Sequence, residues 1–432
     1  MKAGPPIAVV PYRWIVFALL ALGYLLVYFH RLSPAVVALE MMDDLQANAG
    51  LMGLLASAYF YPYALMQIPS GLLSDSWGPR KTITSFFVLA GIASVAFGMA
   101  PSVGWAIAAR VLVGVGVAML FVPTMKVLTC WFTTAEFTLA AGILMAVGGL
   151  GVLSAASPFA YLSTALGWRD SFAIIGVCTL VLAAAIWFLV RDTPQEMGLP
   201  AVNNGGTVEE SGPAIGLWQG VKLVLGSWSF WPLFAWFFFT IGIFFSFSGL
   251  WGGPFLMHVY GLDKLQAGGI LTMPAIALIF GSPAMAYISD RVLHSRKKVM
   301  VISAFAVLAL SVPPAFFPAG FSMAGLYVWC LLLGFFGSAV VIVGFTAAKE
   351  MFPVKIAGTA VGLINIAPFL GGAVMQPVVG MILEAHGKGA AGYSAQAYGN
   401  AFSVFFVSAL IALGAAFFIK ETMPIAPDRA LS

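Results

Sequence analysis

Charged side chains are scarce in this sequence. Only 8% of the 432 residues are Asp, Glu, Lys or Arg, whereas 61% are hydrophobic. Soluble domains usually contain about 25% charged residues, so the composition argues against a soluble enzyme. The net charge of +4 does not indicate nucleic acid as a partner, because the basic residues lie mainly between long apolar stretches and follow the pattern of membrane topology.

Cysteines and motifs for covalent chemistry are also few. Cys130, Cys178 and Cys330 lie far apart in apolar stretches, without the spacing of a disulfide framework or a metal site. A Gly-rich loop followed by Lys and Ser or Thr is missing, which excludes an ATP-driven pump. Paired carboxylates within a span, a His cluster, a nucleophile motif and a soluble sensor domain are missing too. We therefore expect neither an enzyme nor a receptor, and we expect no cofactor and no metal.

The sequence is rich in apolar runs of about 20 residues, the length at which an α-helix crosses a hydrocarbon core of about 30 Å. We predict twelve transmembrane helices in an all-α, multi-pass membrane protein. The approximate spans are residues 14–39, 51–74, 82–100, 103–131, 138–162, 171–190, 229–257, 265–288, 299–317, 322–348, 357–384 and 398–419.

Basic residues gather on one side of this topology. If both termini lie in the cytoplasm, most Lys and Arg residues between the spans are cytoplasmic, and the opposite side receives only Arg169, Lys264 and Lys388. Cytoplasmic loops of membrane proteins carry such an excess of positive charge. The distribution therefore predicts a protein of the cell (inner) membrane with both termini in the cytoplasm.

One polar stretch divides the chain. Residues 191–216 are rich in Gly, Pro and acidic residues, which is the composition of a flexible linker. We predict an N-terminal six-helix bundle (1–190), a cytoplasmic linker (191–228) and a C-terminal six-helix bundle (229–432). The halves share weak similarity, since LSDSWGPRK before the third span corresponds to ISDRVLHSRKK before the ninth. Two repeated halves are typical of transporters that bind substrate near the midplane, where the halves meet.

Several motifs resemble those of the major facilitator superfamily. GLLSDSWGPRK at 71–81 is similar to the loop signature of that family, and RVLVGVG at 110–116 is similar to its fourth-helix pattern. GWRDSF, DTPQEMG and EMFPVKIAGTAVG are also similar to recurring stretches of its members. The resemblance implies a fold of two six-helix pseudo-repeat bundles and transport by alternating access.

The loop signature contains candidate gating residues. The resemblance would place Asp75 against the N-terminus of the eleventh predicted span (357–384), whose partial positive charge favours a carboxylate. Arg80 and Lys81 would pair with nearby carboxylates and with lipid headgroups, and Asp290 is the counterpart of Asp75 in the second half. Contacts of this kind exist only while the cytoplasmic faces touch, so they would stabilise the outward-open state. The alternative is that the basic residues only set the topology.

Two arginines lie inside predicted spans. A charge near the bilayer centre costs roughly 2.5 to 3.5 kcal/mol on insertion scales, so such a residue is a functional-site hypothesis. Tyr24, Tyr28 and Arg31 share one helix face at i, i+4 and i+7, whereas His30 points about 100° away. Arg31 and Arg110 are both predicted in the outer half of the membrane without an acidic partner. We predict that an anion completes this site. Alternatively, Arg31 reaches the headgroups and Arg110 bonds backbone carbonyls.

Within the superfamily, YFHRLSPAVVALEMMDDL and YPYALMQIPSGLLSDSWGPRK are most similar to the branch of organic anion symporters. This resemblance implies that Arg31 and Arg110 contact the substrate carboxylate. The branch usually has Asp before the first of these arginines and often Glu seven residues after the second, where this chain has His30 and Val117. Those acids are the usual proton carriers, so His30 is the group left to titrate and to couple a proton to the anion.

Other candidates for the substrate site lie in the predicted spans 51–74, 229–257 and 357–384. Tyr59 and Tyr63 share a face of the span 51–74, with Gln67 at its edge. Trp251 lies in the Gly-rich stretch FSFSGLWGGPF of the span 229–257, and Asn365 lies in the span 357–384. Helices interrupted by Gly or Pro often mark the binding site in such folds.

We predict a secondary transporter of a small organic anion, most simply a proton symporter, that acts as a monomer in the lipid bilayer. The sequence leaves open an organic phosphate or anion exchanger, and a uniporter or exporter of a less polar solute.

Overall fold

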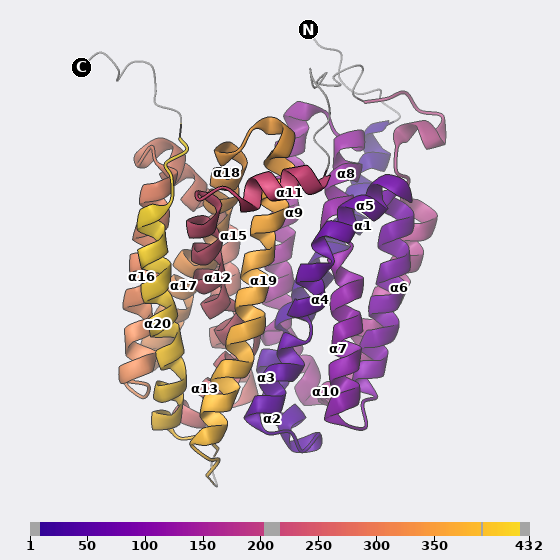
Figure 1. Cartoon of the computed structure of the whole chain (residues 1–432). Helices are drawn as coiled ribbons and strands as arrows, with labels where there is room; N and C mark the ends of the chain where they lie inside the picture. The colour runs from indigo at the N-terminus through magenta and orange to yellow at the C-terminus, as the bar shows by residue number, and fades with distance from the viewer. Residues whose placement is uncertain (1–8, 203–216, 390–391, 424–432) are drawn as a thin grey trace, which may run out of the picture.

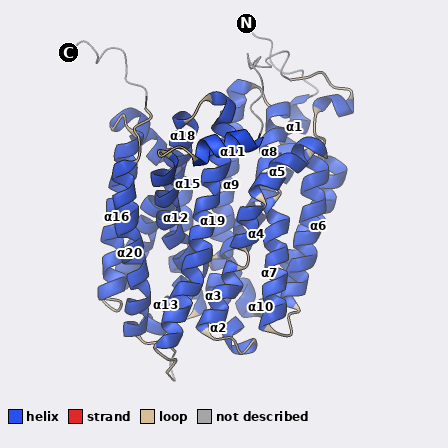
Figure 2. Cartoon of the chain, viewed as in Figure 1, coloured by secondary structure: helices blue, strands red, loops and turns tan. Residues whose placement is uncertain are grey.

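The computed structural model describes residues 9–202, 217–389 and 392–423. Within these ranges the chain forms helices and no strand (Figure 2). Ten helical stretches are long and apolar enough to cross a membrane, and the bent pair Ala49–Leu65 and Gln67–Ser76 gives an eleventh. One of the ten, Leu139–Leu189, has 51 residues and is interrupted at Gly167, where φ is 79°. Divided at this glycine it supplies two spans, so the described residues hold the twelve spans predicted.

The described part of the first half contains ten helices. They are α1 (Val9–Leu32), α2 (Pro34–Asp44), α3 (Ala49–Ser57), α4 (Phe60–Leu65), α5 (Gln67–Ser76), α6 (Pro79–Gly98), α7 (Val103–Ala118), α8 (Phe121–Trp131), α9 (Thr134–Ala155) and α10 (Ser157–Leu189). Several spans are built from more than one helix. The first breaks before Pro34, because a proline is accepted in the first turn of a helix but not in its interior.

The second half follows the short helices η1 (Pro194–Met197) and α11 (Leu217–Leu225). Its elements are α12 (Phe230–Ser246), η2 (Phe247–Trp251), α13 (Gly252–Tyr260), α14 (Lys264–Leu271), α15 (Met273–Tyr287), η3 (Ile288–Val292), α16 (Arg296–Phe316), α17 (Met323–Gly334), η4 (Phe335–Ala339), α18 (Val341–Met351), α19 (Val354–Ala385) and α20 (Ala395–Phe418). The segments η2, η3 and η4 are π-helical, a distortion that is frequent at functional sites. Residues 203–216 of the predicted linker lie outside the described residues.

The two halves stand side by side, with their helices roughly parallel (Figure 1). α1 begins and α20 ends at the same end of the bundle, which we call the terminal face; the opposite end is the distal face. α11 lies across the terminal face above α19 (Figure 1). The charge distribution predicts that the terminal face is cytoplasmic.

The halves approach each other closely towards the distal face. α19 packs along α3 and α4, and α13 packs against α2. A methyl group at Gly253 would overlap the carbonyl oxygen of Ala35, and one at Gly380 would overlap that of Ala49. Glycine is therefore required at both positions, since the main chains of the two halves are in direct contact there.

Polar contacts also join the halves at the distal face. Lys264 of α14 forms an ion pair with Glu40 of α2, and Lys388 Nζ lies 3.1 Å from Asp43 Oδ1. Glu384, near the end of α19, accepts a hydrogen bond of 3.1 Å from the backbone N–H of Ala49. This carboxylate therefore lies at the N-terminus of α3, where the helix dipole stabilises a negative charge.

Ion pairs near the terminal face have a different arrangement. Asp75 pairs with Lys126 of α8 at 2.7 Å, and Arg13 pairs with Glu136 at 3.0 Å; all four residues belong to the first half. Among the residues that the structure describes, hydrogen bonds and ion pairs between the halves lie at the centre and at the distal face. The distal face is thus the closed side of the molecule.

Candidate functional site

Arg31 lies near the end of α1, close to the break before α2, and only 3% of it is exposed. Its guanidinium carbon is 4.5 Å from the ring centre of Tyr28, 4.8 Å from that of Tyr63, 4.8 Å from that of Phe369 and 5.5 Å from that of Phe245. Two of these rings come from α1 and α4, and the other two come from α12 and α19. One buried cation is therefore enclosed by rings from both halves. We call the four rings the aromatic box.

Arg31 has no acidic partner in the described part of the chain. None of the ion pairs there includes it, and its buried Nε has no hydrogen-bond partner. A cation over an aromatic ring gains about 0.5 to 2 kcal/mol, depending on desolvation. The guanidinium fork can donate two parallel charge-assisted hydrogen bonds to a carboxylate or sulfonate, a stronger interaction. The site therefore has the chemistry to bind an anion.

Rings from the two halves also contact each other. The Tyr63 and Phe369 ring centres are 4.3 Å apart across the interface, whereas Phe245 stacks on Phe369 at 5.9 Å within the second half. Phe60 of α4 extends the cluster, with its ring centre 5.2 Å from that of Phe245. Movement of one half relative to the other must therefore change the contacts of Tyr63 with Phe369 and of Phe60 with Phe245.

Two amides lie next to the box on the side of the terminal face. Asn365 Nδ2 donates a hydrogen bond of 3.0 Å to Gln67 Oε1, across the two halves. Gln67 Nε2 donates to the backbone oxygen of Tyr63 at 3.2 Å. Gln67 follows Tyr63 by one helical turn, so this amide pair bridges the halves one turn closer to the terminal face than the box. Both amides can donate to the oxygens of an anion.

The second intramembrane arginine, Arg110 of α7, is 1% exposed. Its Nη1 donates a hydrogen bond of 2.8 Å to the carbonyl oxygen of His30, while Nε and Nη2 are buried without a hydrogen-bond partner. Its guanidinium carbon lies 5.0 Å from the Tyr59 ring, which stacks on Tyr63 at 5.7 Å. The two arginines are thus connected through stacked tyrosine rings.

The imidazole of His30 is buried and turned away from the aromatic box. Its Nε2 lies 3.4 Å from Thr179 Oγ1 of α10, which belongs to the first half. The adjacent position in α1 points about 100° away from Arg31, which explains this orientation. His30 therefore contacts Arg110 through its carbonyl oxygen and α10 through its side chain.

Trp251 is fully buried at the end of η2. Its Nε1 donates a hydrogen bond of 2.9 Å to the backbone oxygen of Gln376 in α19. The Gln376 side chain donates in turn to the backbone oxygen of Phe245 at 3.0 Å. Trp251 and Gln376 therefore hold the π-helical break against α19 and position the segment that carries Phe245.

The predicted gating residues of the first half contact their own half and the beginning of the linker. Besides the pair of Asp75 with Lys126, the backbone N–H of Arg80 donates to Asp192 Oδ1 at 2.6 Å, and the Arg80 guanidinium lies over the Trp187 ring. Burial raises the pKa of Asp192 above its ordinary value, against the opposing effect of the Arg80 N–H. Lys81 is exposed.

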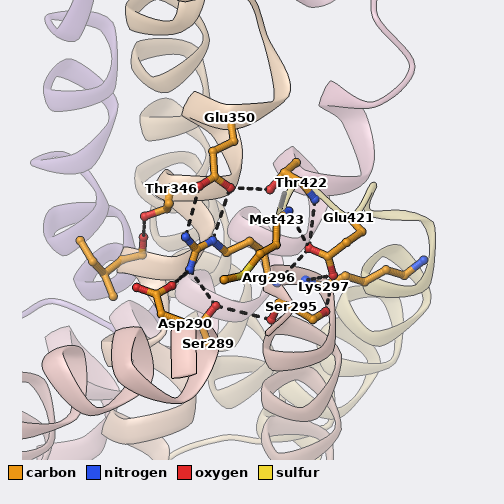
Figure 3. A network of polar contacts seen from close by, with 11 residues as sticks. Ser289, Asp290, Ser295, Arg296, Lys297, Thr346, Glu350, Glu421, Thr422 and Met423 are labelled. Carbon is orange, nitrogen blue, oxygen red and sulfur yellow. Dashed lines mark hydrogen bonds and ion pairs between the residues drawn. The ribbon is translucent and has the colours of Figure 1, made fainter. Parts of the chain in front are cut away.

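Asp290 belongs to a polar network at the terminal face of the second half, shown in Figure 3. Arg296 at the start of α16 forms an ion pair with Asp290, and its Nη2 lies 3.2 Å from Glu350 Oε1 of α18. Glu421, which follows α20, accepts hydrogen bonds from the Ser295 hydroxyl and from the backbone N–H of Arg296 at 3.0 Å. The segment after α20 is therefore attached to the beginning of α16.

The protonation of Glu421 reflects these contacts. Burial alone would raise the pKa of this carboxyl, but hydrogen bonds from Ser295 and from the backbone N–H groups of Arg296, Thr422 and Met423 outweigh burial and lower the pKa. The carboxylate caps the first turn of α16, where the helix dipole also favours negative charge.

A cavity of about 650 Å³ lies at the distal face, away from the aromatic box. It is lined by Glu40, Asp44, Trp168, Asp263 and Lys264, among others. Because it includes the Lys264–Glu40 ion pair, it marks the place where the halves meet on the closed side.

The sequence did not indicate Phe245, Phe369 or the partner of Asp75. A signal for Phe369 was available, since it follows Asn365 by one helical turn and so shares its face of α19. No comparable signal exists for Phe245, because α12 is apolar on all sides.

The family model for the Major Facilitator Superfamily matches residues 16–375 and 252–430. A probable sulfoacetate transporter, SauU of Cupriavidus necator, is 25% identical over 396 residues, which cover 87% of this chain and 88% of the relative. A D-galactonate transporter of Escherichia coli is 22% identical over 432 residues, covering 94% and 95%. A probable galactarate/D-glucarate transporter, GudP of Bacillus subtilis, is 24% identical over 402 residues, covering 87% of each chain.

Solved structures resemble the fold as a whole. A bacterial homologue of the human lysosomal transporter Spinster, in an inward-facing and unoccupied conformation, superimposes with a TM-score of 0.75. The two chains are 18% identical, and the match covers 95% of this chain and 96% of the homologue. At this identity the likeness concerns the fold alone.

Proposed function

The chain belongs to the Major Facilitator Superfamily and is a transporter, and we propose that its cargo is a small organic anion carried by alternating access. The observation that supports this most is Arg31, a buried cation without an acidic partner among the described residues, enclosed by rings from both halves. The relatives named for sulfoacetate, galactonate and glucarate support the same class of cargo.

In the proposed complex the carboxylate or sulfonate of the cargo pairs with the guanidinium of Arg31. The planar fork of an arginine matches two oxygens at once, which a lysine cannot do. The side chains of Gln67 and Asn365 then offer amide donors and acceptors to the rest of the cargo. Binding at the interface lets the cargo contact both halves, so it can influence their relative movement.

The two faces of the molecule support alternating access. We assign the structure to an inward-facing state of a monomer with cytoplasmic termini in the inner membrane. In this state Lys264–Glu40 and Glu384 with the N-terminus of α3 hold the distal face closed. In the outward-facing state we expect these contacts to open and Asp75 to leave Lys126 for the N-terminus of α19.

Proton symport through His30 stays a prediction. Its carbonyl oxygen binds Arg110, so a charge on its imidazole would act on the arginine next to it. The contact of its side chain with Thr179, away from the aromatic box, favours a second candidate, the exchange of one anion for another. Proton-driven uptake distinguishes the two mechanisms.

A thermal-shift experiment on purified protein tests the cargo class. Sulfoacetate, D-galactonate and glycerol phosphate are compared with the neutral sugar D-galactose. A ligand that binds only the folded state at 100 times its Kd stabilises the protein by about 2.7 kcal/mol. We expect an increase in melting temperature with at least one anion and none with the sugar.

The variant Arg31→Lys links that shift to the site. It keeps the charge but loses the fork, so we expect its affinity for the stabilising anion to fall at least about tenfold, the equivalent of about 1.4 kcal/mol. Arg13→Lys is the matched control, because Arg13 pairs with Glu136 away from the box. Equal affinity of wild type and Arg31→Lys, or stabilisation by the sugar alone, contradicts the proposal.

A further inference from the structure

The aromatic box contains two kinds of ring. Tyr28 and Tyr63, from the half that carries Arg31, have hydroxyl groups and retain polar character. Phe245 and Phe369, from the opposite half, are purely apolar, yet their ring centres lie 5.5 Å and 4.8 Å from the guanidinium carbon. Apolar rings beside a buried cation need an explanation, because a polar side chain would interact with it more strongly.

The geometry of a guanidinium group supplies one. The group is planar, so only two rings can cover its faces, and four rings around it must also occupy part of its edge. The N–H groups point outward along this edge, and a carboxylate binds there in the plane of the group. Because Arg31 is 3% exposed, an anion can reach the edge only if at least one ring moves.

The rings of the second half are the ones positioned to move. Tyr28 lies three residues before Arg31 on the same helix, so its distance from the guanidinium is set by α1 itself. Phe369 and Phe245 belong to α19 and α12, which change position relative to α1 whenever the halves move. Phe369 also lies against Tyr63 at 4.3 Å, so its departure opens the box on the side of the interface.

We propose that Phe245 and Phe369 are positioning residues that act as replaceable partners of the Arg31 guanidinium: they cover it between transport events, and the anionic group of the cargo displaces them. The negative faces of the rings compensate the charge in part. A carrier without cargo can therefore close around Arg31 without isolating an unpaired charge, which would otherwise be costly in a membrane. This inference rests on the proposed function, because it takes Arg31 as the anion-binding group.

A double-mutant cycle tests the interaction without any ligand. Melting temperatures are measured for wild type, Phe369→Leu, Arg31→Met and the double variant. If the ring serves the cation, Phe369→Leu lowers the melting temperature clearly in the presence of Arg31 and much less in the Arg31→Met protein. Equal losses in both backgrounds mean that Phe369 only fills space, and they overturn the proposal. Arg31→Gln replaces Arg31→Met if the latter does not fold.

The matched control is Phe239→Leu. Phe239 is a half-buried ring on α12 that contacts the ring of Phe238 and lies outside the box. Its loss is expected to lower the melting temperature by the same amount with Arg31 and with Met at position 31. A coupling as large as that of Phe369 would show that the effect is not specific to the box.

A binding measurement with sulfoacetate tests the displacement. Removing a competing ring is expected to tighten sulfoacetate binding about two- to fivefold in Phe369→Leu, which corresponds to the usual strength of one cation–ring contact. Weaker binding in Phe369→Leu would show that the ring holds the cargo instead of competing with it. If sulfoacetate does not bind wild type, its role as cargo is refuted, and the double-mutant cycle still decides whether the rings serve Arg31.

Discussion

The ion pair between Lys264 and Glu40 allows a quantitative prediction about the closed distal face. The side chain of Lys264 is 13% exposed and that of Glu40 is 41% exposed. Measured ion pairs at protein surfaces contribute about 0.2 to 1 kcal/mol, and the burial of Lys264 places this pair near the upper end. Because the pair joins the halves only when the distal face is closed, Lys264→Gln should shift the equilibrium about fivefold towards the open distal face, the equivalent of about 1 kcal/mol.

The second pair across the same face provides a graded comparison. Lys388 and Asp43 are 44% and 71% exposed, so solvent screens their interaction and we expect Lys388→Gln to shift the equilibrium by less than about twofold. Distances between spin labels at Ala165 and Gln396, exposed positions of α10 and α20, report the population of each state. The native cysteines are replaced beforehand.

A pair within one half serves as the control. Arg13→Gln breaks the contact with Glu136, so it should lower the melting temperature without changing the distances across the distal face. If Lys264→Gln leaves the distance distribution as in wild type, the ion pair does not hold the distal face and the reasoning is refuted. A larger effect of Lys388→Gln than of Lys264→Gln would show that burial does not determine the contribution.

Three further predictions concern other parts of the molecule. Asp75→Asn should change the melting temperature little, because Asp75 is 74% exposed in its pair with Lys126; labels across the terminal face should nevertheless report a shift towards the state with that face open. His30→Ala should abolish uphill uptake of sulfoacetate driven by a proton gradient and leave counterflow partly intact, and persistent proton-driven uptake would exclude His30 as the carrier. Glu421→Gln should lower the melting temperature at neutral pH. The pKa of the Glu421 carboxyl is lowered in the folded protein, so this group stabilises the fold above its unfolded pKa of about 4.3. The stabilisation is lost as the pH falls through the folded pKa. The melting temperatures of wild type and Glu421→Gln should therefore converge at acidic pH, and a difference that does not change with pH would refute the assignment.

The fold followed from apolar length, because each run that can span the bilayer has to form a helix. Hydropathy did not show where spans break. The run 14–39 contains most of α1 and part of α2, and α2 begins at Pro34. The proline was visible in the sequence. Its effect on a span depends, however, on which neighbouring groups form hydrogen bonds with the backbone groups that the proline leaves unpaired.

The site was predictable within a helix and not between helices. The spacing of Tyr28 and Arg31 predicted a common face, and the ring lies 4.5 Å from the guanidinium carbon. Phe245 lies on a helix that is apolar on all sides, so periodicity does not fix which residues face the other half. The partner of Asp75 depends in addition on the conformational state. The same sequence adopts more than one state, so it does not specify a single partner.

The main chains of the two halves are in direct contact at Gly253 and Ala35. The interface near the distal face therefore has no room for even one added carbon atom at Gly253. Side chains at a gate can rotate aside, but a carbonyl oxygen can yield only if a whole helix shifts. A single methyl in Gly253→Ala would thus act as a wedge between α13 and α2. The Gly253→Ala protein would favour the outward-facing state, with the distal face open. It could be used to crystallise that state or to raise antibody fragments specific for it, without any change to the residues around Arg31.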